Sequence, residues 1–201
     1  MAKQVQIKHR WSGAVLFTAD IPDDTPSGME MRVALENATR AGAYLAGANL
    51  AGANLVGANL ADAYLVGADL TDAYLADAYL VGADLTDAYL ARANLVGANL
   101  ADANLAGANL AGAKWRNGIV ITKRPVQVYG LLWAVTILDA HMQIGCELHT
   151  LAEWSAFDDA RIVQMDGREA LRFWREHKDA LLGLARGAGR SFDPVVQEVA
   201  A

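Results

Sequence analysis

A repeat of five residues dominates the middle of this chain of 201 residues, where Leu recurs at every fifth position from Leu45 to Leu110. An α-helix turns by about 100° per residue, so these Leu side chains would spread around its surface and leave no apolar stripe. A flat strand fails as well, because residues five apart face opposite sides of a sheet. The period instead predicts a chain that turns a corner every five residues, with four such sides in a coil of twenty residues.

The composition of each repeat predicts which side chains fill that coil. Leu and the Ala two residues before it recur together, as in Ala48-Asn49-Leu50-Ala51-Gly52, and both point inward if each repeat forms one side. Each buried Leu contributes on the order of 1.5 to 3 kcal/mol to the core. The fourteen repeats between residues 43 and 112 therefore predict a rigid, Leu-filled solenoid of about three and a half coils.

This A[NDY]LxG pattern resembles the pentapeptide-repeat family over residues 43–112. The resemblance implies a right-handed quadrilateral β-helix, here of about 3.5 to 4 coils. Arg40 and Trp115 replace the inward Leu just outside the repeat, which predicts where the regular coils end. The expected fold is mainly β, with an N-terminal hairpin and helix cap over 1–42, the β-helix over 43–113 and a small α+β domain over 114–201.

The N-terminal segment carries the signals of a cap. Apolar alternation on both sides of Ser12-Gly13 predicts a β-hairpin over residues 5–18. Ser27 and Glu30 resemble a capping box that opens a helix, and Gly42 is placed to end it. Such a helix would cover the open end of the first coil, whose strand edges are otherwise unpaired.

The C-terminal segment has no repeats, and its pattern predicts three strands followed by two helices. The strands are expected over 118–122, 126–129 and 131–138. Thr150 and Glu153 form a capping box for the first helix, and the second is expected to begin near Asp166 and to end at Gly187. The expected inner face of the second helix comprises Leu171, Trp174, Leu181 and Leu184.

The stretch W-x-V-x-I-L-D-x-H-M-x-I-G-C, from Trp133 to Cys146, resembles the C-terminal region of pentapeptide-repeat proteins from phage and prophage genomes. That resemblance implies no activity. Its side chains support a zinc hypothesis, with Asp139, His141, Cys146 and His149 as ligands.

The zinc hypothesis has two alternatives. The spacing H-x4-C-x2-H matches no common zinc signature, and ordinary packing of a lone Cys and nearby His explains the same residues. A cysteine nucleophile at Cys146, with His149 as its base, is the other alternative. Trp133, Trp154 and Trp174 are expected in the core.

The net charge of −6 belongs to the repeat, because basic and acidic residues balance in both flanks. An acidic surface does not bind nucleic acid directly, but it can attract a protein that does. The repeat contains Arg92 and seven aspartates: Asp62, Asp69, Asp72, Asp77, Asp84, Asp87 and Asp102. Asp72 and Arg92 fall on neighbouring coils of one side and are predicted to pair.

Some pentapeptide-repeat proteins resemble a DNA duplex in width and charge and occupy the DNA-binding groove of gyrase or topoisomerase. The resemblance thus implies a DNA-mimicking inhibitor of such an enzyme, or of a defence nuclease. Counting by twenty, however, spreads the acids over all four sides, so the alternative is that they solubilise the surface and hydrogen-bond the corners. The outward tyrosines form a second candidate binding surface, again with packing as the alternative: Tyr44, Tyr64, Tyr74, Tyr79 and Tyr89.

No Gly-rich phosphate loop, pair of carboxylates in a plausible pocket or nucleophilic Ser elbow is present in the sequence, so an enzyme is not expected. The expected function is binding of a protein partner, with no cofactor unless the zinc site exists. The alternatives are a C-terminal domain that binds a metal or ligand on a β-helix scaffold, and a structural homo-oligomer. The sequence has no apolar leader and no membrane-length apolar run, so a cytoplasmic protein without membrane attachment is expected.

Overall fold

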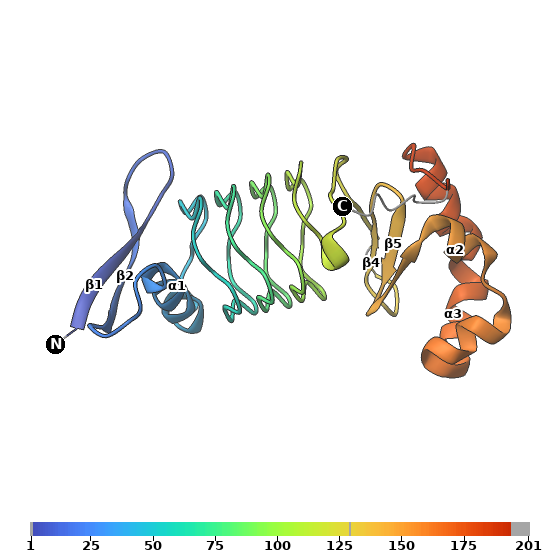
Figure 1. Ribbon diagram of the computed structural model, residues 1–201, viewed down its shortest axis with the longest axis horizontal. Coiled ribbons are helices and arrows are strands. Elements are labelled where there is room, and N and C mark those ends of the chain that lie inside the picture. The colour runs from blue at the N-terminus through green and yellow to red at the C-terminus, as the bar shows by residue number, and fades with distance from the viewer. Residues whose placement is uncertain (1, 129, 194–201) are drawn as a thin grey trace, which may run out of the picture. The chain divides into compact units, whose positions relative to one another are not determined.

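The computed structural model describes residues 2–128 and 130–193, and the chain divides into two units, 1–124 and 125–201 (Figure 1). The first unit contains the repeat and the second contains a four-stranded sheet with two helices. Within the described ranges, none of the helices is both long enough and apolar enough to cross a membrane.

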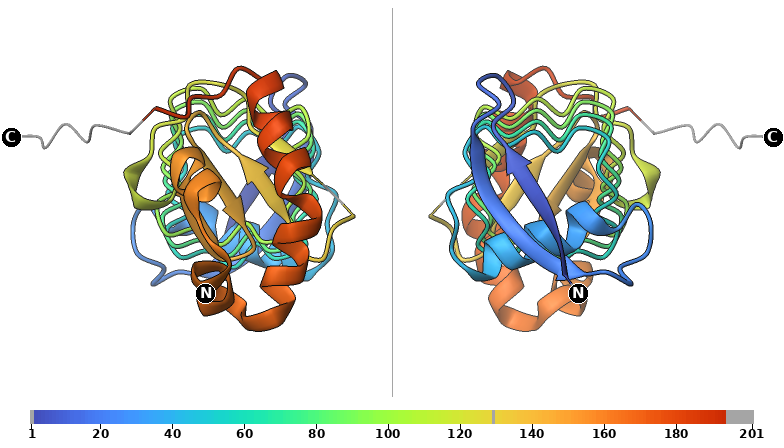
Figure 2. Two further views of the ribbon diagram at one scale, coloured as in Figure 1. Left: turned by 90° about the vertical axis from the view of Figure 1, so that its right-hand side faces the viewer. Right: turned by 90° about the vertical axis from the view of Figure 1, so that its left-hand side faces the viewer.

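Parallel bridges between residues twenty apart define the β-helix. They join Tyr44 to Tyr64 at the start of the repeat and Asn94 to Lys114 at its end. Between these, backbone N–H groups donate to the next coil and to the previous one: Leu45 N donates to Tyr64 O at 3.0 Å. One coil therefore takes four repeats, and successive coils superimpose when viewed end-on (Figure 2).

Leu and Ala fill the inside of the β-helix, as the five-residue period predicts. Of the fourteen repeat leucines, all except Leu100 are buried, together with most of the alanines two positions earlier. Trp115 takes the place of an inward Leu at the end of the repeat and is only 2% exposed. The core therefore continues up to the residue at which the regular pattern stops.

The predicted hairpin precedes the β-helix and is confirmed. Strand β1 (Ala2–Lys8) pairs antiparallel with β2 (Val15–Pro22). Between them, Gly13 has a φ of 68°, a left-handed conformation that glycine adopts without steric cost.

Helix α1 (Glu30–Arg40) ends before Gly42, whose φ is 65°, as predicted, but its start differs from the prediction. The residue before the first turn is Met29, and it makes no side-chain capping bond. Ser27 lies too far upstream to cap this helix. The Glu30 carboxylate instead accepts a bond from Gly28 N at 2.6 Å, so the predicted capping box is wrong.

Helix α1 covers the exposed edge of the first coil (Figure 2). Arg32 donates to Val56 O at 2.8 Å, and the Glu36 carboxylate accepts from Asn59 N at 3.0 Å. These backbone groups have no preceding coil to bind. The Arg32–Glu36 pair, at 3.1 Å, thus supplies a donor and an acceptor where the coil ladder begins.

The second unit contains an antiparallel sheet of order β3-β4-β5-β6. Its strands are β3 (Val126–Val128), β4 (Val135–Ile137), β5 (His141–Ile144) and β6 (Glu147–Thr150). The hairpin of β5 and β6 was not predicted, because its polar residues, including two His, break up the apolar alternation. Of the predicted strand 126–129, Tyr129 lies outside the described residues.

The strand predicted over 118–122 is wrong. A short 3-10 turn, η1 (Arg116–Gly118), begins this stretch, with Asn117 at a φ of 57°. Val120 makes a single antiparallel bridge to Lys114, so the chain folds back against the last coil and does not start a new strand.

The two helices of the second unit follow the sheet. Helix α2 (Leu151–Ala156) has the predicted capping box, with Thr150 and Glu153 bonded to each other's backbone N–H groups. Helix α3 (Asp159–Gly187) is broken at Asp166 and Gly167, where the second helix was predicted to begin. The turns before that break were missed, and Leu184, expected on the inner face, is 42% exposed.

Candidate functional site

The tyrosines of the repeat are exposed, and their bridges place them on all four sides of the coil. Tyr44 and Tyr64 lie parallel on one side, with ring centroids 4.8 Å apart and an angle of 6° between the rings, so these two rings stack. The remaining three occupy different columns, each next to Asn or Asp in the neighbouring coils: Tyr74, Tyr79 and Tyr89. These side chains therefore form no single aromatic patch.

Five of the seven aspartates stand at corners of the coil, in the position that Gly fills in other repeats. Their φ values lie between 55° and 58°, in the left-handed region that Asp tolerates better than most residues. They are Asp62, Asp72, Asp77, Asp87 and Asp102. These acids thus have a local structural reason to be where they are.

Asp69 and Asp84 stand on the sides of the coil and bond their own corners. Their carboxylates accept from the backbone N–H of Thr71 and Thr86, each at 3.1 Å. Asn94 makes the same bond to Val96 N at 3.2 Å. Asn and Asp are therefore interchangeable here as Asx-turn residues.

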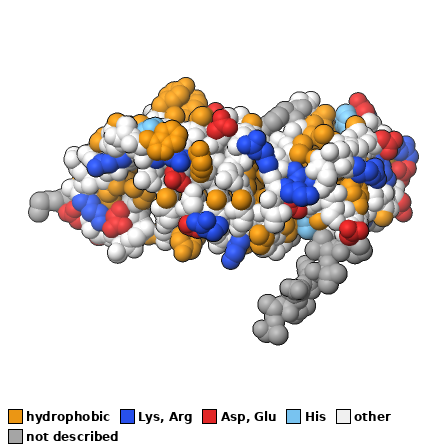
Figure 3. All heavy atoms as spheres, turned by 90° about the horizontal axis from the view of Figure 1, so that it is seen from above, with side chains coloured by type: hydrophobic (Ala, Val, Ile, Leu, Met, Phe, Trp, Pro, Cys, Tyr) orange, Lys and Arg blue, Asp and Glu red, His pale blue; other side chains and the backbone are white. Residues whose placement is uncertain are grey.

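The register of twenty keeps the acids apart within residues 42–122, because no Asp lies directly above another. Asp72 is followed one coil later by Arg92, which donates to both carboxylate oxygens, at 2.7 and 2.6 Å, so the predicted pair is confirmed. The hydrogen bonds from Arg92 lower the pKa of the Asp72 carboxyl. On the face drawn in Figure 3, acidic side chains of the first unit are scattered among neutral and basic ones.

Arg10 lies in the turn between β1 and β2, and its side chain packs against the side of the β-helix. Its guanidinium is 3.9 Å from the centroid of the Tyr89 ring and within 4.0 Å of the Asp69 carboxylate. Its backbone N–H donates to Gly47 O at 2.8 Å. Two of the predicted binding residues, Asp69 and Tyr89, are therefore partly engaged within the chain.

The second unit does not bring the four zinc candidates together. His149 pairs with Met142 across the β5–β6 hairpin, so its side chain faces the opposite side of the sheet from His141, the residue next to Met142. Cys146 is exposed in the turn at the far end of the hairpin from His141. Among the described residues, no three His, Cys, Asp or Glu side chains are grouped so that they could hold a metal ion.

The zinc candidates have other neighbours. His149 Nε2 lies 2.9 Å from a Glu147 carboxylate oxygen, and its ring meets those of Trp154 and Phe157 edge to face. Burial lowers the pKa of the His141 imidazole. The negative charges of Glu153 and Asp139 raise this pKa, but by less. The Oδ1 atom of Asp139 lies 3.5 Å from the Nη1 atom of Arg190.

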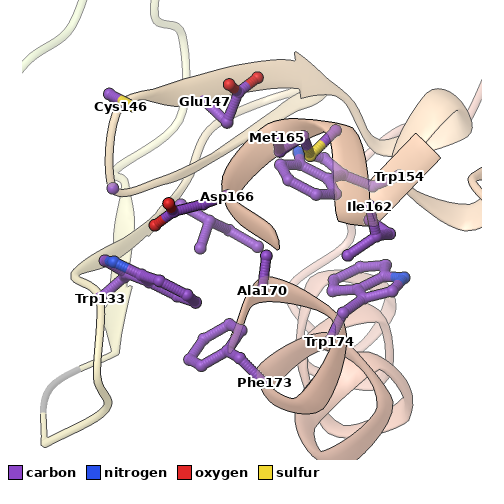
Figure 4. Close-up of a pocket in the computed structure, with 12 residues that line it drawn as sticks. Trp133, Cys146, Glu147, Trp154, Ile162, Met165, Asp166, Ala170, Phe173 and Trp174 are labelled. Carbon is purple, nitrogen blue, oxygen red and sulfur yellow. The ribbon is translucent and has the colours of Figure 1, made fainter. Parts of the chain in front are cut away.

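A cavity of about 230 Å³, which the sequence did not predict, opens between the β5–β6 hairpin and helices α2 and α3 (Figure 4). Trp133, Trp154, Phe173 and Trp174 form its aromatic lining, and the lining also includes Cys146, Glu147 and Asp166. The three tryptophans were expected only as core residues. The signal in the sequence that could have indicated this cavity was the pair Asp166 and Gly167, where α3 is broken. The break turns a carboxylate toward the aromatic cluster.

The family model for pentapeptide repeats matches the chain over residues 41–76, 68–105 and 78–117, in eight copies. No curated protein matches the chain. Nineteen chains of solved structures match, three of which are HetL, Rfr23 and alr5209, and this chain spans about half the length of the first two.

One is HetL, a pentapeptide repeat protein involved in heterocyst differentiation regulation from the cyanobacterium Nostoc sp. strain PCC 7120. The two sequences are 32% identical over 38% of this chain and 42% of HetL, and the TM-score is 0.27. Another is Rfr23 from the cyanobacterium Cyanothece 51142, at 34% identity over 37% and 58%, with a TM-score of 0.27. The third is alr5209 from Nostoc PCC 7120, at 32% identity over 45% and 84%, with a TM-score of 0.20. Through the repeats of residues 41–117, the chain belongs to the pentapeptide repeat family.

Proposed function

We propose that the chain is a non-enzymatic interaction protein whose β-helix binds a protein partner through its outer surface. The observation that carries this proposal is the filled interior: Leu and Ala occupy the inward positions and leave no room for a substrate. Only the outer side chains remain to recognise another molecule. Pentapeptide repeat proteins typically act in this way, as interaction modules without catalysis.

The finer proposal for the fold is a right-handed quadrilateral β-helix of about 3.5 to 4 coils. The twenty-residue bridges from Tyr44 to Lys114 support four sides per coil. Such a solenoid presents its outer residues on a hydrogen-bonded frame, so a partner meets a surface that is already ordered, which lowers the entropic cost of binding.

For the partner, the more specific proposal is an enzyme that handles DNA, such as gyrase, topoisomerase or a defence nuclease. The acidic surface of the β-helix would bind this enzyme in place of DNA. The net charge of the repeat supports it, because DNA-binding grooves are basic. Charge on DNA forms continuous rows, with one charge per ~1.7 Å of the duplex. Here the acids are dispersed over corners and sides, and Asp72 is neutralised by Arg92. The tyrosines are dispersed over the four sides as well, so the alternative version is recognition through separate aromatic contacts, with the acids as further contacts.

Two matched variants separate these versions. The repeat already has Asn at the side positions that correspond to Asp69, Asp84 and the tyrosines, and Asn tolerates the left-handed corners that the other five aspartates occupy. One replaces all seven repeat aspartates by Asn, which keeps the Asx turns and tolerates the left-handed corners. The other replaces Tyr64, Tyr74 and Tyr79 by Asn. Each is compared with the natural protein in affinity capture from bacterial lysate and in competition with duplex DNA for the captured enzyme.

Loss of a DNA-handling enzyme with the seven-Asn variant alone would establish electrostatic mimicry. Loss with the tyrosine variant alone would establish aromatic recognition. A partner retained by both variants would bind elsewhere and would overturn the proposal that the β-helix surface is the binding site.

A further inference from the structure

The cavity of the second unit has an aromatic wall. Trp133 meets Phe173 edge to face, and Trp154 lies tilted against Trp174, each pair with ring centroids 5.0 Å apart. The faces of such rings attract cations that come within about 6 Å. Trp174 already does so, since Lys178 Nζ lies 5.6 Å from its centroid. The wall therefore suits an apolar or a cationic guest.

The charged groups that line the cavity are both acidic. Glu147 comes from β6, and Asp166 comes from the break in α3, where its φ of −150° and ψ of 46° leave the helical range. In Figure 4 the Asp166 carboxylate lies on the same side of the cavity as Trp133. The lining residues, all of them within the described ranges, include no Lys, Arg or His. His149 contacts Glu147 from outside the lining.

We propose that this cavity binds a small organic cation with an apolar body, its charged group at Glu147 and Asp166 and its body among the aromatic rings. An anion would face two carboxylates, and His149, the basic group that contacts Glu147, lies outside the cavity lining. A neutral guest would fill the apolar space but gain nothing from the charges. A cation gains from both the carboxylates and the ring faces. This site lies in the second unit and is independent of the function proposed for the β-helix.

The size of the cavity restricts the guest. Its volume is about 230 Å³. It is smaller than the ~300 to 1,000 Å³ of sites for drug-sized ligands. A single aromatic ring or a short branched alkyl chain carrying one ammonium group fits this space.

The test compares three probes of similar size on the full chain: 2-phenylethylammonium, 2-phenylethanol and phenylacetate. Binding is followed by the tryptophan indole N–H signals in NMR and by calorimetry. We expect saturable binding of the ammonium probe, at least fivefold tighter than the alcohol, with phenylacetate weakest. Equal affinity for the ammonium and the alcohol would overturn the proposal, as would the absence of saturable binding by the ammonium probe.

Charge-removing variants of the same shape test the residues. Glu147→Gln and Asp166→Asn should each weaken the ammonium probe by about fivefold, the upper range for a partly exposed ion pair, and leave the alcohol unchanged. Glu169→Gln is the matched control, because Glu169 is an exposed acid of α3 outside the cavity lining. If this control weakens the ammonium probe as much as Asp166→Asn does, the effect is general surface charge and the site is refuted. Near-ultraviolet circular dichroism establishes that each variant keeps its aromatic packing.

Discussion

Asp87 and Gly107 occupy the same corner of successive coils, and the Asp87 carboxylate fills the space that a Cβ atom on Gly107 would need. The same relationship joins Asp62 to Gly82 and Asp77 to Gly97. Asp72 is followed one coil later by Arg92 instead of Gly, and the Arg92 guanidinium forms an ion pair with the Asp72 carboxylate. Each of these aspartates therefore restricts the residue twenty positions later, a constraint that the five-residue repeat alone does not reveal.

Gly107→Ala should destabilise the protein more than Gly52→Ala. Both positions have positive φ, so a Cβ costs roughly 1 kcal/mol in each. Only at Gly107 does the Cβ also collide with a carboxylate, whereas Gly52 faces open space. We expect an additional cost of about 0.5 to 1 kcal/mol in the free energy of unfolding for Gly107→Ala, measured by chemical denaturation, because the exposed Asp87 side chain must rotate away from the new Cβ atom. Adding Asp87→Gly should remove that extra cost; equal costs in the two single variants would contradict the argument.

The ion pair of Asp72 and Arg92 should make stability depend on acidic pH. Because Arg92 lowers the pKa of Asp72 in the folded state, the unfolded chain takes up the proton first. The stabilisation is thus present above the unfolded Asp pKa of about 3.9 and is lost as pH falls through the lowered value.

An Arg92→Gln variant provides the comparison. Its melting temperature should lie below that of the natural protein at neutral pH, and the two should converge in strong acid. Carbon NMR of the Asp72 carboxyl should show a higher pKa in Arg92→Gln than in the natural chain. An unchanged carboxyl pKa would refute the coupling.

Arg10 and Tyr89 should stabilise the protein as a coupled pair, since the guanidinium lies 3.9 Å from the ring centroid and the side chain is only 13% exposed. A double-mutant cycle with Arg10→Ala and Tyr89→Asn should give a coupling of about 1 kcal/mol in the free energy of unfolding. Asn is accepted at that position by other repeats, so the coil itself is preserved. Arg10→Lys keeps the charge but not the flat contact and should recover only part of the loss. Strictly additive effects would exclude the coupling.

The repeat could be interpreted from the sequence because its information is local and regular. Leu at every fifth position identified the inward side chains, and a count of twenty placed Asp72 beside Arg92. The β5–β6 hairpin lacked that regularity: His141 and His149 read as ligands because they lie close in sequence, whereas the hairpin register turns them to opposite faces. The cavity depends on contacts between strands and helices far apart in the chain, such as Trp133 with Phe173. No local pattern predicts these contacts.

His141 should make the protein less stable below neutral pH. Its burial lowers its pKa in the folded state, so the unfolded chain binds the proton more readily near the ordinary His value of about 6.5. The stabilisation that comes from the neutral His141 imidazole should be fully present above that value. It should be lost as pH falls through the lowered pKa that His141 has in the folded protein. His141→Gln removes this proton uptake and should flatten the decline, as measured by denaturation between pH 7.5 and pH 5. Parallel stability curves for the two proteins, or an NMR titration of His141 at an ordinary pKa, would show that burial does not keep this imidazole neutral.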